Sequence, residues 1–385
     1  MAAYIFRRLL LIVPTLLGIM VINFALIQFV PGGPIDQVIA QLEGEGDVFQ
    51  TISGGGTEAG PIEVESNGYQ GARGLPERFL QDLELDFNFA RIVCDAGFSG
   101  EPDLDAPECT TEPIPAVERF FLMMWDYVRF DFGESFFHSE TVVELVIDKM
   151  PVSISLGLWS TLIAYLVSIP LGIRKAVRDG SRFDTVTSGV IIAAYAIPGF
   201  LFAILLLVLF AGGSYLQWFP LRGLTSPSDV WETLSWWQKI FDYFHHIALP
   251  VLASTIGAFA TLTLLTKNSF LEEIKKQYVM TAKAKGLSEA RMLYGHVFRN
   301  AMLIVIAGFP AVFVGVFFGQ SLIIETIFSL DGLGRLGFEA VVSRNYPVVF
   351  GTLFAFSLLG LVVGIISDLM YIWIDPRIDF ETRET

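Results

Sequence analysis

The chain carries few residue patterns that could perform chemistry by themselves. Its four histidines do not show the spacing of a zinc site, and no nucleophile is paired with a base at a motif spacing. No G-x-x-x-x-G-K-[ST] segment occurs, so the sequence predicts no ATP-binding phosphate loop. Residues 332–337 match G-x-G-x-x-G, but they follow an apolar stretch instead of a strand, and we interpret these glycines as shaping a tight turn. We therefore expect no catalytic residue, metal or cofactor in this chain.

Two carboxylates lie in or near long apolar segments, where a charge is costly unless it faces a cavity or a partner. Glu325 has two interpretations, and both stay open. It contacts the amino group or a Lys or Arg side chain of a substrate on a path that Gln320 and Ser321 also line, or it forms a buried structural pair. For Asp368 we favour the structural pair.

The most informative segment is residues 267–300, a basic stretch between two apolar segments. Residues 271–285 form a run of helix formers, and Gly286 is a natural helix stop because glycine accepts the left-handed conformation after a last turn. Ser288 is then a good N-cap for a second short helix. The pattern predicts helix, tight turn, helix, which suits either docking into a groove of another protein or binding to anionic lipid heads.

The same residues resemble a known family. The segment 278–288 (YVMTAKAKGLS), followed by HVFRNA at 296–301, resembles the EAA loop of binding-protein-dependent ABC importers of the peptide/nickel permease family. RRLLLIVP at 7–14 and ETIFSLDGLGRLG at 325–337 agree in order, and the resemblance covers the chain except residues 40–110. The outer insert and IDPRIDF at 374–380 are similar to the B-type permeases that import oligopeptides and the peptide antibiotic microcin C. The glutamate that names the motif would fall at Met280, so the resemblance implies docking but no particular salt bridge.

The resemblance implies an all-α polytopic protein with the type I importer permease fold and six transmembrane helices. It implies a second homologous permease, separate ABC ATPase subunits that bind ATP and magnesium, a periplasmic solute-binding protein and a peptide substrate. The residues that it implies for ATPase coupling lie within 278–290: Tyr278, Thr281, Ala282, Lys283, Ala284, Lys285, Gly286, Leu287, Ser288 and Glu289.

Hydropathy predicts the spans independently. Apolar residues make up 53% of the chain and charged residues 17%, against about 25% charged in soluble domains. A span needs roughly 20 apolar residues, and six segments qualify: 9–30, 153–173, 188–211, 247–265, 302–330 and 349–374. The first is too long for a signal-peptide core and lacks a cleavage site, so we expect an uncleaved span. The predicted organisation is 1–30 (N-terminus and first span), 31–150 (outer insert) and 151–385 (five-helix core).

The acidity of the chain belongs to the insert. Residues 31–150 hold 24 Asp/Glu and 6 Lys/Arg, whereas the whole chain has a net charge of -15. Cys94 and Cys109 also lie there, and they predict a disulfide if the compartment is oxidising and two unpaired thiols if it is not. Residues 117–130 and 142–150 have amphipathic helical patterns. We hypothesise that the acidic insert receives the binding protein or attracts cationic peptides.

The distribution of Lys and Arg predicts the orientation. Short loops on the N-terminal side hold 15 of them and those on the other side hold 4, so both termini are expected in the cytoplasm of a bacterial inner-membrane protein. The sequence shows no basic face that could meet phosphates, so we expect no nucleic-acid partner. An ion-coupled secondary transporter remains the alternative function, although no inverted repeat is evident.

Overall fold

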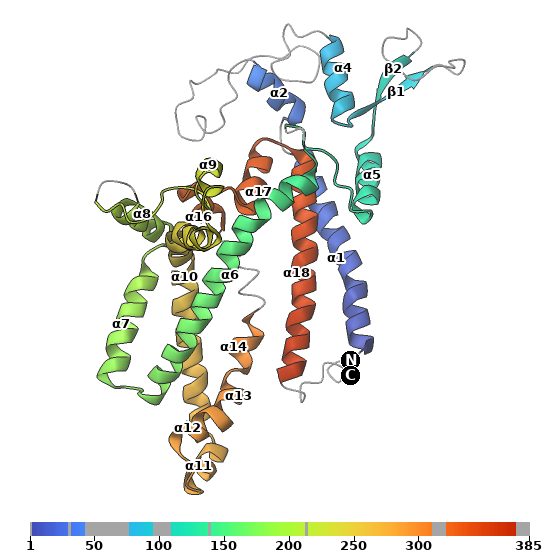
Figure 1. Ribbon diagram of the computed structural model, residues 1–385. Coiled ribbons are helices and arrows are strands. Elements are labelled where there is room, and N and C mark those ends of the chain that lie inside the picture. The colour runs from blue at the N-terminus through green and yellow to red at the C-terminus, as the bar shows by residue number, and fades with distance from the viewer. Residues whose placement is uncertain are drawn as a thin grey trace. The chain divides into compact units, whose positions relative to one another are not determined.

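The computed structural model describes residues 2–29, 32–42, 77–94, 109–137, 140–211, 215–309 and 321–374. They divide into two compact units. Figure 1 shows their helices and strands as a ribbon. Unit 1 combines Met1–Leu10, Ile147–Leu336 and Leu359–Thr385, and unit 2 combines Leu11–Val146 and Gly337–Leu358. Unit 2 therefore joins the predicted insert with parts of the first and last spans, so the compact units do not follow the linear order of the chain.

Among the described residues, four helices are long and apolar enough to cross a membrane, and they coincide with the first, second, fourth and sixth predicted spans. They are α1 (Ala2–Phe29), α6 (Val142–Val177), α10 (Trp236–Ile274) and α18 (Tyr346–Ile374). The amphipathic pattern at 142–150 is the first part of α6, which continues through Pro151. The fifth predicted span is described only at its ends, by α14 (Leu303–Ala307) and α16 (Ser321–Ile327), because residues 310–320 lie outside the described ranges.

The third predicted span is not one continuous helix. It is divided into α7 (Arg182–Ala196) and α8 (Gly199–Phe210), which meet at an angle of 93°. The cause is Pro198, which has no N–H to continue the helix and disfavours the helical conformation of the residue before it. Ile197 is accordingly extended, with φ -81° and ψ 121°.

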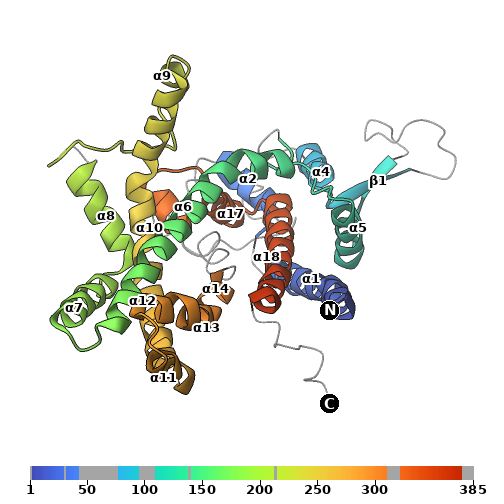
Figure 2. The ribbon, with the colours of Figure 1, turned by 60° about the horizontal axis from the view of Figure 1, so that its bottom comes forward.

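Unit 1 is held together mainly by α10. The α6 and α10 backbones approach closely at Gly172, where a Cβ would lie 2.6 Å from the Cβ of Thr266. Two buried apolar clusters flank this crossing, one around Leu156 and Ile247 and the other around Phe270 and Val297. The short helix α9 (Ser228–Trp231) lies at one end of α10, and α11 (Gln277–Ala284) and α12 (Glu289–Met292) lie at the opposite end, as Figures 1 and 2 show.

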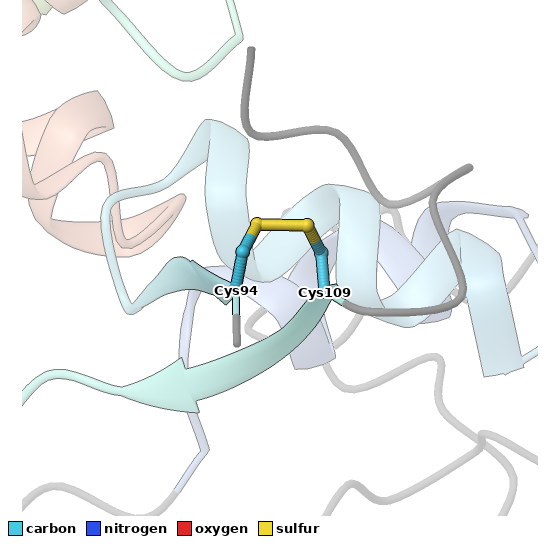
Figure 3. The surroundings of a disulfide bond; sticks show 2 residues. All are labelled: Cys94 and Cys109. Atoms are coloured by element: carbon cyan, nitrogen blue, oxygen red, sulfur yellow. A yellow bond between two sulfur atoms is a disulfide. The ribbon is translucent and has the colours of Figure 1, made fainter. Parts of the chain in front are cut away.

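Unit 2 contains a short hairpin that an all-α prediction did not include. Strands β1 (Ala90–Cys94) and β2 (Cys109–Pro113) pair antiparallel, with Cys94 directly opposite Cys109. A disulfide joins the two cysteines across this register (Figure 3). The helices of this unit also include α2 (Pro34–Leu42), α4 (Glu77–Asp86) and α5 (Ala116–Val128), while α17 (Leu333–Val342) begins at the boundary. The α5 helix confirms the amphipathic prediction at 117–130; the Gly-rich stretch at 43–75 lies outside the described residues.

Candidate functional site

The predicted coupling loop folds as two short helices beyond the end of α10. They are α11 (Gln277–Ala284) and α12 (Glu289–Met292). The run of helix formers at 271–285 is divided between two helices, since α10 ends at Ile274 and Lys276 is extended with ψ 150°. The buried Glu273 carboxylate stabilises this break by pairing with the Lys276 ammonium and accepting a 2.7 Å hydrogen bond from the Tyr278 hydroxyl.

The turn between the two helices depends on Gly286, as the sequence predicted. Its φ is +78°, a conformation that side chains disfavour. The Leu287 N–H donates to the Ala282 carbonyl at 3.3 Å, and the Gly286 N–H donates to the Lys283 carbonyl at 3.0 Å. Ser288 occupies the N-cap position of α12, but its side chain makes no capping hydrogen bond. The turn is therefore stabilised by backbone contacts and by the glycine.

The loop is firmly attached to the membrane-spanning helix. Val279 and Val297 are buried against Phe270 of α10, with exposed fractions of 2% and 0%. The Ser269 hydroxyl donates to the Ala301 carbonyl, and the Asn300 amide donates to the Tyr278 hydroxyl at 3.2 Å. Sequence reasoning did not single out Val279 or Val297, although apolar residues within a basic loop are the signal that could have identified them.

The opposite face of the loop is exposed and basic. Among the predicted coupling residues, Tyr278, Ala282 and Leu287 are half-buried, and the exposed ones are Thr281, Lys283, Ala284, Lys285, Gly286, Ser288 and Glu289. Met280, at the position of the family glutamate, is 60% exposed. Burial and the Glu273 carboxylate raise the pKa of Tyr278 to about 12. The same carboxylate raises the pKa of Lys276, so this ammonium stays charged at neutral pH.

A buried charge cluster fixes α6 and α7 to α10 near the start of this loop. The Lys175 side chain is fully buried, and its ammonium lies 3.0 Å from the Asp184 carboxylate and 2.7 Å from the Ser188 hydroxyl, to which it donates a hydrogen bond. Lys267 of α10 pairs with Asp184 at 2.7 Å and with Asp179 at 2.9 Å. The sequence pattern indicates these lysines only as orientation signals, because the carboxylate partners of Lys267 lie 83 and 88 residues away along the chain.

Glu325 is fully buried, and both of its carboxylate oxygens accept hydrogen bonds from within unit 1. Ser153 donates to one at 2.9 Å, and the Arg335 N–H donates to the other at 2.8 Å. A Cβ on Gly332 would overlap this carboxylate, so the glycine permits the close approach. These contacts favour the structural interpretation of Glu325. Gln320 lies outside the described residues, and of Ser321 only its place at the start of α16 is described.

Asp368 likewise forms a structural pair. Its carboxylate lies 3.0 Å from the Arg8 guanidinium and accepts a 3.0 Å hydrogen bond from the Tyr4 hydroxyl. The pair connects the beginning of α1 to the end of α18 within unit 1. The interpretation favoured from the sequence agrees with these contacts.

The long apolar helices and the exposed, anchored loop indicate a polytopic membrane protein. Comparison with known proteins identifies its family. Residues 168–380 match the family model described as binding-protein-dependent transport system inner membrane component. The chain belongs to this family, the permease subunits of ABC importers.

Several relatives are similar over essentially the whole chain. It is 58% identical to the peptidoglycan transport system permease protein YejB of Agrobacterium fabrum (strain C58 / ATCC 33970), and 54% identical to the inner membrane ABC transporter permease protein YejB of Escherichia coli O157:H7, with 100% of each chain covered. It is 29% identical to the oligopeptide transport system permease protein AppB of Bacillus subtilis (strain 168), over 99% of this chain and 100% of that one.

This membership decides between the alternatives left open by the sequence. The protein is a multi-pass inner-membrane transport subunit with the type I ABC importer permease fold, and not an enzyme. The alternative of an ion-coupled secondary transporter is thereby set aside.

Proposed function

We propose that this chain is the transmembrane subunit through which an ATP-driven importer moves oligopeptides, including microcin C-like peptides, from the periplasm to the cytoplasm. The proposed cargo is supported by the names of two relatives, one for peptidoglycan transport and one for oligopeptide transport. Peptidoglycan contains short peptide chains, so the two names agree on a peptide cargo. It is also supported by the resemblance of the outer insert and the C-terminal residues to oligopeptide and microcin C permeases.

The importer needs three kinds of partner. A second homologous permease completes the pathway, a pair of ABC ATPase subunits binds ATP and magnesium, and a periplasmic solute-binding protein delivers the peptide. The family description, binding-protein-dependent transport, supports the last of these. The absence of a phosphate-binding loop from the sequence supports a separate ATPase.

The observation that carries the coupling role is the construction of the 278–289 loop. One face is anchored to α10 by Val279 and Val297, so a force applied to the loop reaches a membrane span without first deforming a flexible linker. The other face presents small side chains and lysines to solvent. This combination suits seating in a groove of the ATPase at the cytoplasmic side, and it accords with the orientation that the Lys and Arg counts predict.

A pull-down of the tagged chain from its native membranes tests this role. Gly286→Trp places a bulky side chain at the exposed turn, where a Cβ would meet nothing within 4 Å. Gly180→Trp is the matched control, because Gly180 is also exposed, has φ +74° and meets nothing within 4 Å, but lies in the turn between α6 and α7.

We expect the wild-type chain and Gly180→Trp to bring down an ATPase and a second permease. Gly286→Trp should lose the ATPase while it stays inserted and keeps the second permease. Equal ATPase recovery with all three chains would refute docking at this loop. Reconstituted complexes that take up a labelled tripeptide without ATP would refute the ATP-driven mechanism.

A further inference from the structure

Unit 2 contains a cavity of about 720 Å³ that the transport mechanism above does not use. Its wall is formed by α5, the turn at residues 131–136, the connection from α4 to β1, and single faces of α1 and α18. Cavities that bind small molecules commonly have volumes of about 300–1,000 Å³. The size of this one therefore suits a ligand as large as a short peptide segment.

Aromatic rings form most of the apolar wall. Phe87 stacks on Phe136 with ring centroids 4.2 Å apart, and Tyr127 meets Phe132 edge to face at 4.9 Å. The Arg119 guanidinium already lies over the Phe89 ring, 4.4 Å from its centroid. This contact demonstrates that a ring face in the wall accommodates a cation, an interaction that strengthens when water is excluded.

The rim of the cavity is acidic. Among the described residues that line it, Asp86, Asp126, Asp131 and Glu134 are acidic and Arg119 is the one cationic residue. All four carboxylates are exposed. Asp131 accepts a hydrogen bond from the Gly133 N–H, and the other three form no ion pair within the described part of the chain. Like charges gathered around an apolar concavity concentrate a negative potential there.

The cavity lining also includes Tyr127, whose hydroxyl is a hydrogen-bond donor. Burial, and then the Asp126 carboxylate, raise the pKa of the Tyr127 phenol, so this hydroxyl stays protonated at neutral pH. The backbone of the 131–136 turn is held in place by Asn345, whose amide donates to Ser135 at 2.7 Å and accepts from the Phe136 N–H at 3.2 Å. The cavity is therefore a built feature of the unit.

We propose that this cavity is a binding site for an organic cation carried on an apolar or aromatic body, such as an ammonium or guanidinium group next to an apolar side chain. The carboxylates attract the charge and the rings contact the body. The negative rim disfavours the binding of anions, and a neutral apolar molecule gains no electrostatic attraction from the carboxylates. The cation can belong to a peptide or to a free amine, and the site does not depend on the proposed coupling to an ATPase.

The test measures binding to the purified full chain in nanodiscs, without ATP. The cationic probe is the tripeptide Phe-Lys-Phe with a free N-terminus and an amidated C-terminus. The neutral probe is N-acetyl-Phe-norleucine-Phe amide, and phenethylammonium represents a free amine. Isothermal calorimetry at low and high salt gives the affinity for each probe.

Two variants locate the binding. Asp126→Asn with Glu134→Gln removes two rim charges, and Asp82→Asn with Glu140→Gln is the matched control, because these exposed carboxylates belong to the same unit but do not line the cavity. Met123→Trp leaves the charge unchanged and fills space, since Met123 is half-buried in the wall.

We expect a cationic probe to bind wild type and the control pair equally, to bind the rim variant about tenfold more weakly, and to lose binding to Met123→Trp. Preference for the tripeptide over phenethylammonium identifies a peptide as the ligand, and the reverse identifies a free amine. Equal binding of the neutral probe, equal loss in the control pair, or no binding of either cation would overturn the proposal. A failed ATPase pull-down would leave this binding result unaffected.

Discussion

The coupling loop is stabilised by contacts between residues close in sequence, whereas unit 2 is stabilised by contacts between residues far apart in sequence. In the loop, Glu273 contacts Tyr278 five residues away, and Tyr278 contacts Asn300 22 residues away. In unit 2, Asn345 contacts Ser135 and Phe136 across 210 and 209 residues. A loop made of near neighbours can be predicted from its own sequence, whereas unit 2 exists only once distant parts of the chain have assembled.

The largest effect is expected at the buried charge cluster. Asp184→Ala leaves the fully buried Lys175 ammonium without its carboxylate, which should destabilise the chain by about 3–5 kcal/mol. Asp179→Ala is the control, because its half-exposed carboxylate contacts only the Lys267 side of the cluster, and exposed pairs contribute about 0–1 kcal/mol. Thermal unfolding in detergent measures both. If the two variants lose the same stability, the cluster does not fix α7 to α10.

The disulfide offers the next test, within unit 2. Cys94→Ser with Cys109→Ser removes a cross-link between residues 15 apart, worth about 3 kcal/mol by the chain-entropy argument. Hydrogen exchange should accelerate in β1 and β2 and remain unchanged in α11 and α12. Faster exchange in the loop as well would contradict the independence of the two regions.

Alkaline pH tests the local contacts of the loop. The folded-state pKa of Tyr278 is raised from its ordinary value near 10 to about 12. Because a raised pKa favours the protonated form, its contribution to stability is complete below pH 10 and is lost as the pH rises through 12. The tyrosinate absorbance of wild type minus that of Tyr278→Phe should show a late titration. A midpoint near 10 would mean that burial and the Glu273 contact do not act on this phenol.

The smallest expected effect is at Ser288. An N-cap serine usually contributes about 1 kcal/mol through its side chain, but this hydroxyl makes no capping hydrogen bond. Ser288→Ala should therefore change the unfolding free energy of the loop by less than about 0.5 kcal/mol. Hydrogen exchange of α12 measures the change, with Thr281→Ala as a second exposed substitution in α11 for comparison. A loss near 1 kcal/mol would mean that the Ser288 hydroxyl forms a capping hydrogen bond with the α12 backbone.

Sequence patterns predicted those features whose cause is local. Long apolar runs must be helical in lipid, which identified α1, α6, α10 and α18. Gly286 predicted the turn between α11 and α12 because only glycine adopts its conformation easily. The break at Pro198 could also have been predicted from local chemistry, but the continuous hydropathy of residues 188–211 obscured it.

Tertiary structure alone decided the contacts between residues that are far apart in the sequence. The pairing of Lys267 with Asp184, the hydrogen bond from Ser153 to Glu325 and the lining of the unit 2 cavity by five segments all depend on residues far apart in sequence. A side chain's own neighbours determine its backbone preference, but its burial and partners are set only when the chain folds. The sequence by itself therefore determined a membrane permease with a basic helix–turn–helix loop. The tertiary structure decided which groups the Glu325 and Asp368 carboxylates contact, and it placed an aromatic, acidic cavity in unit 2.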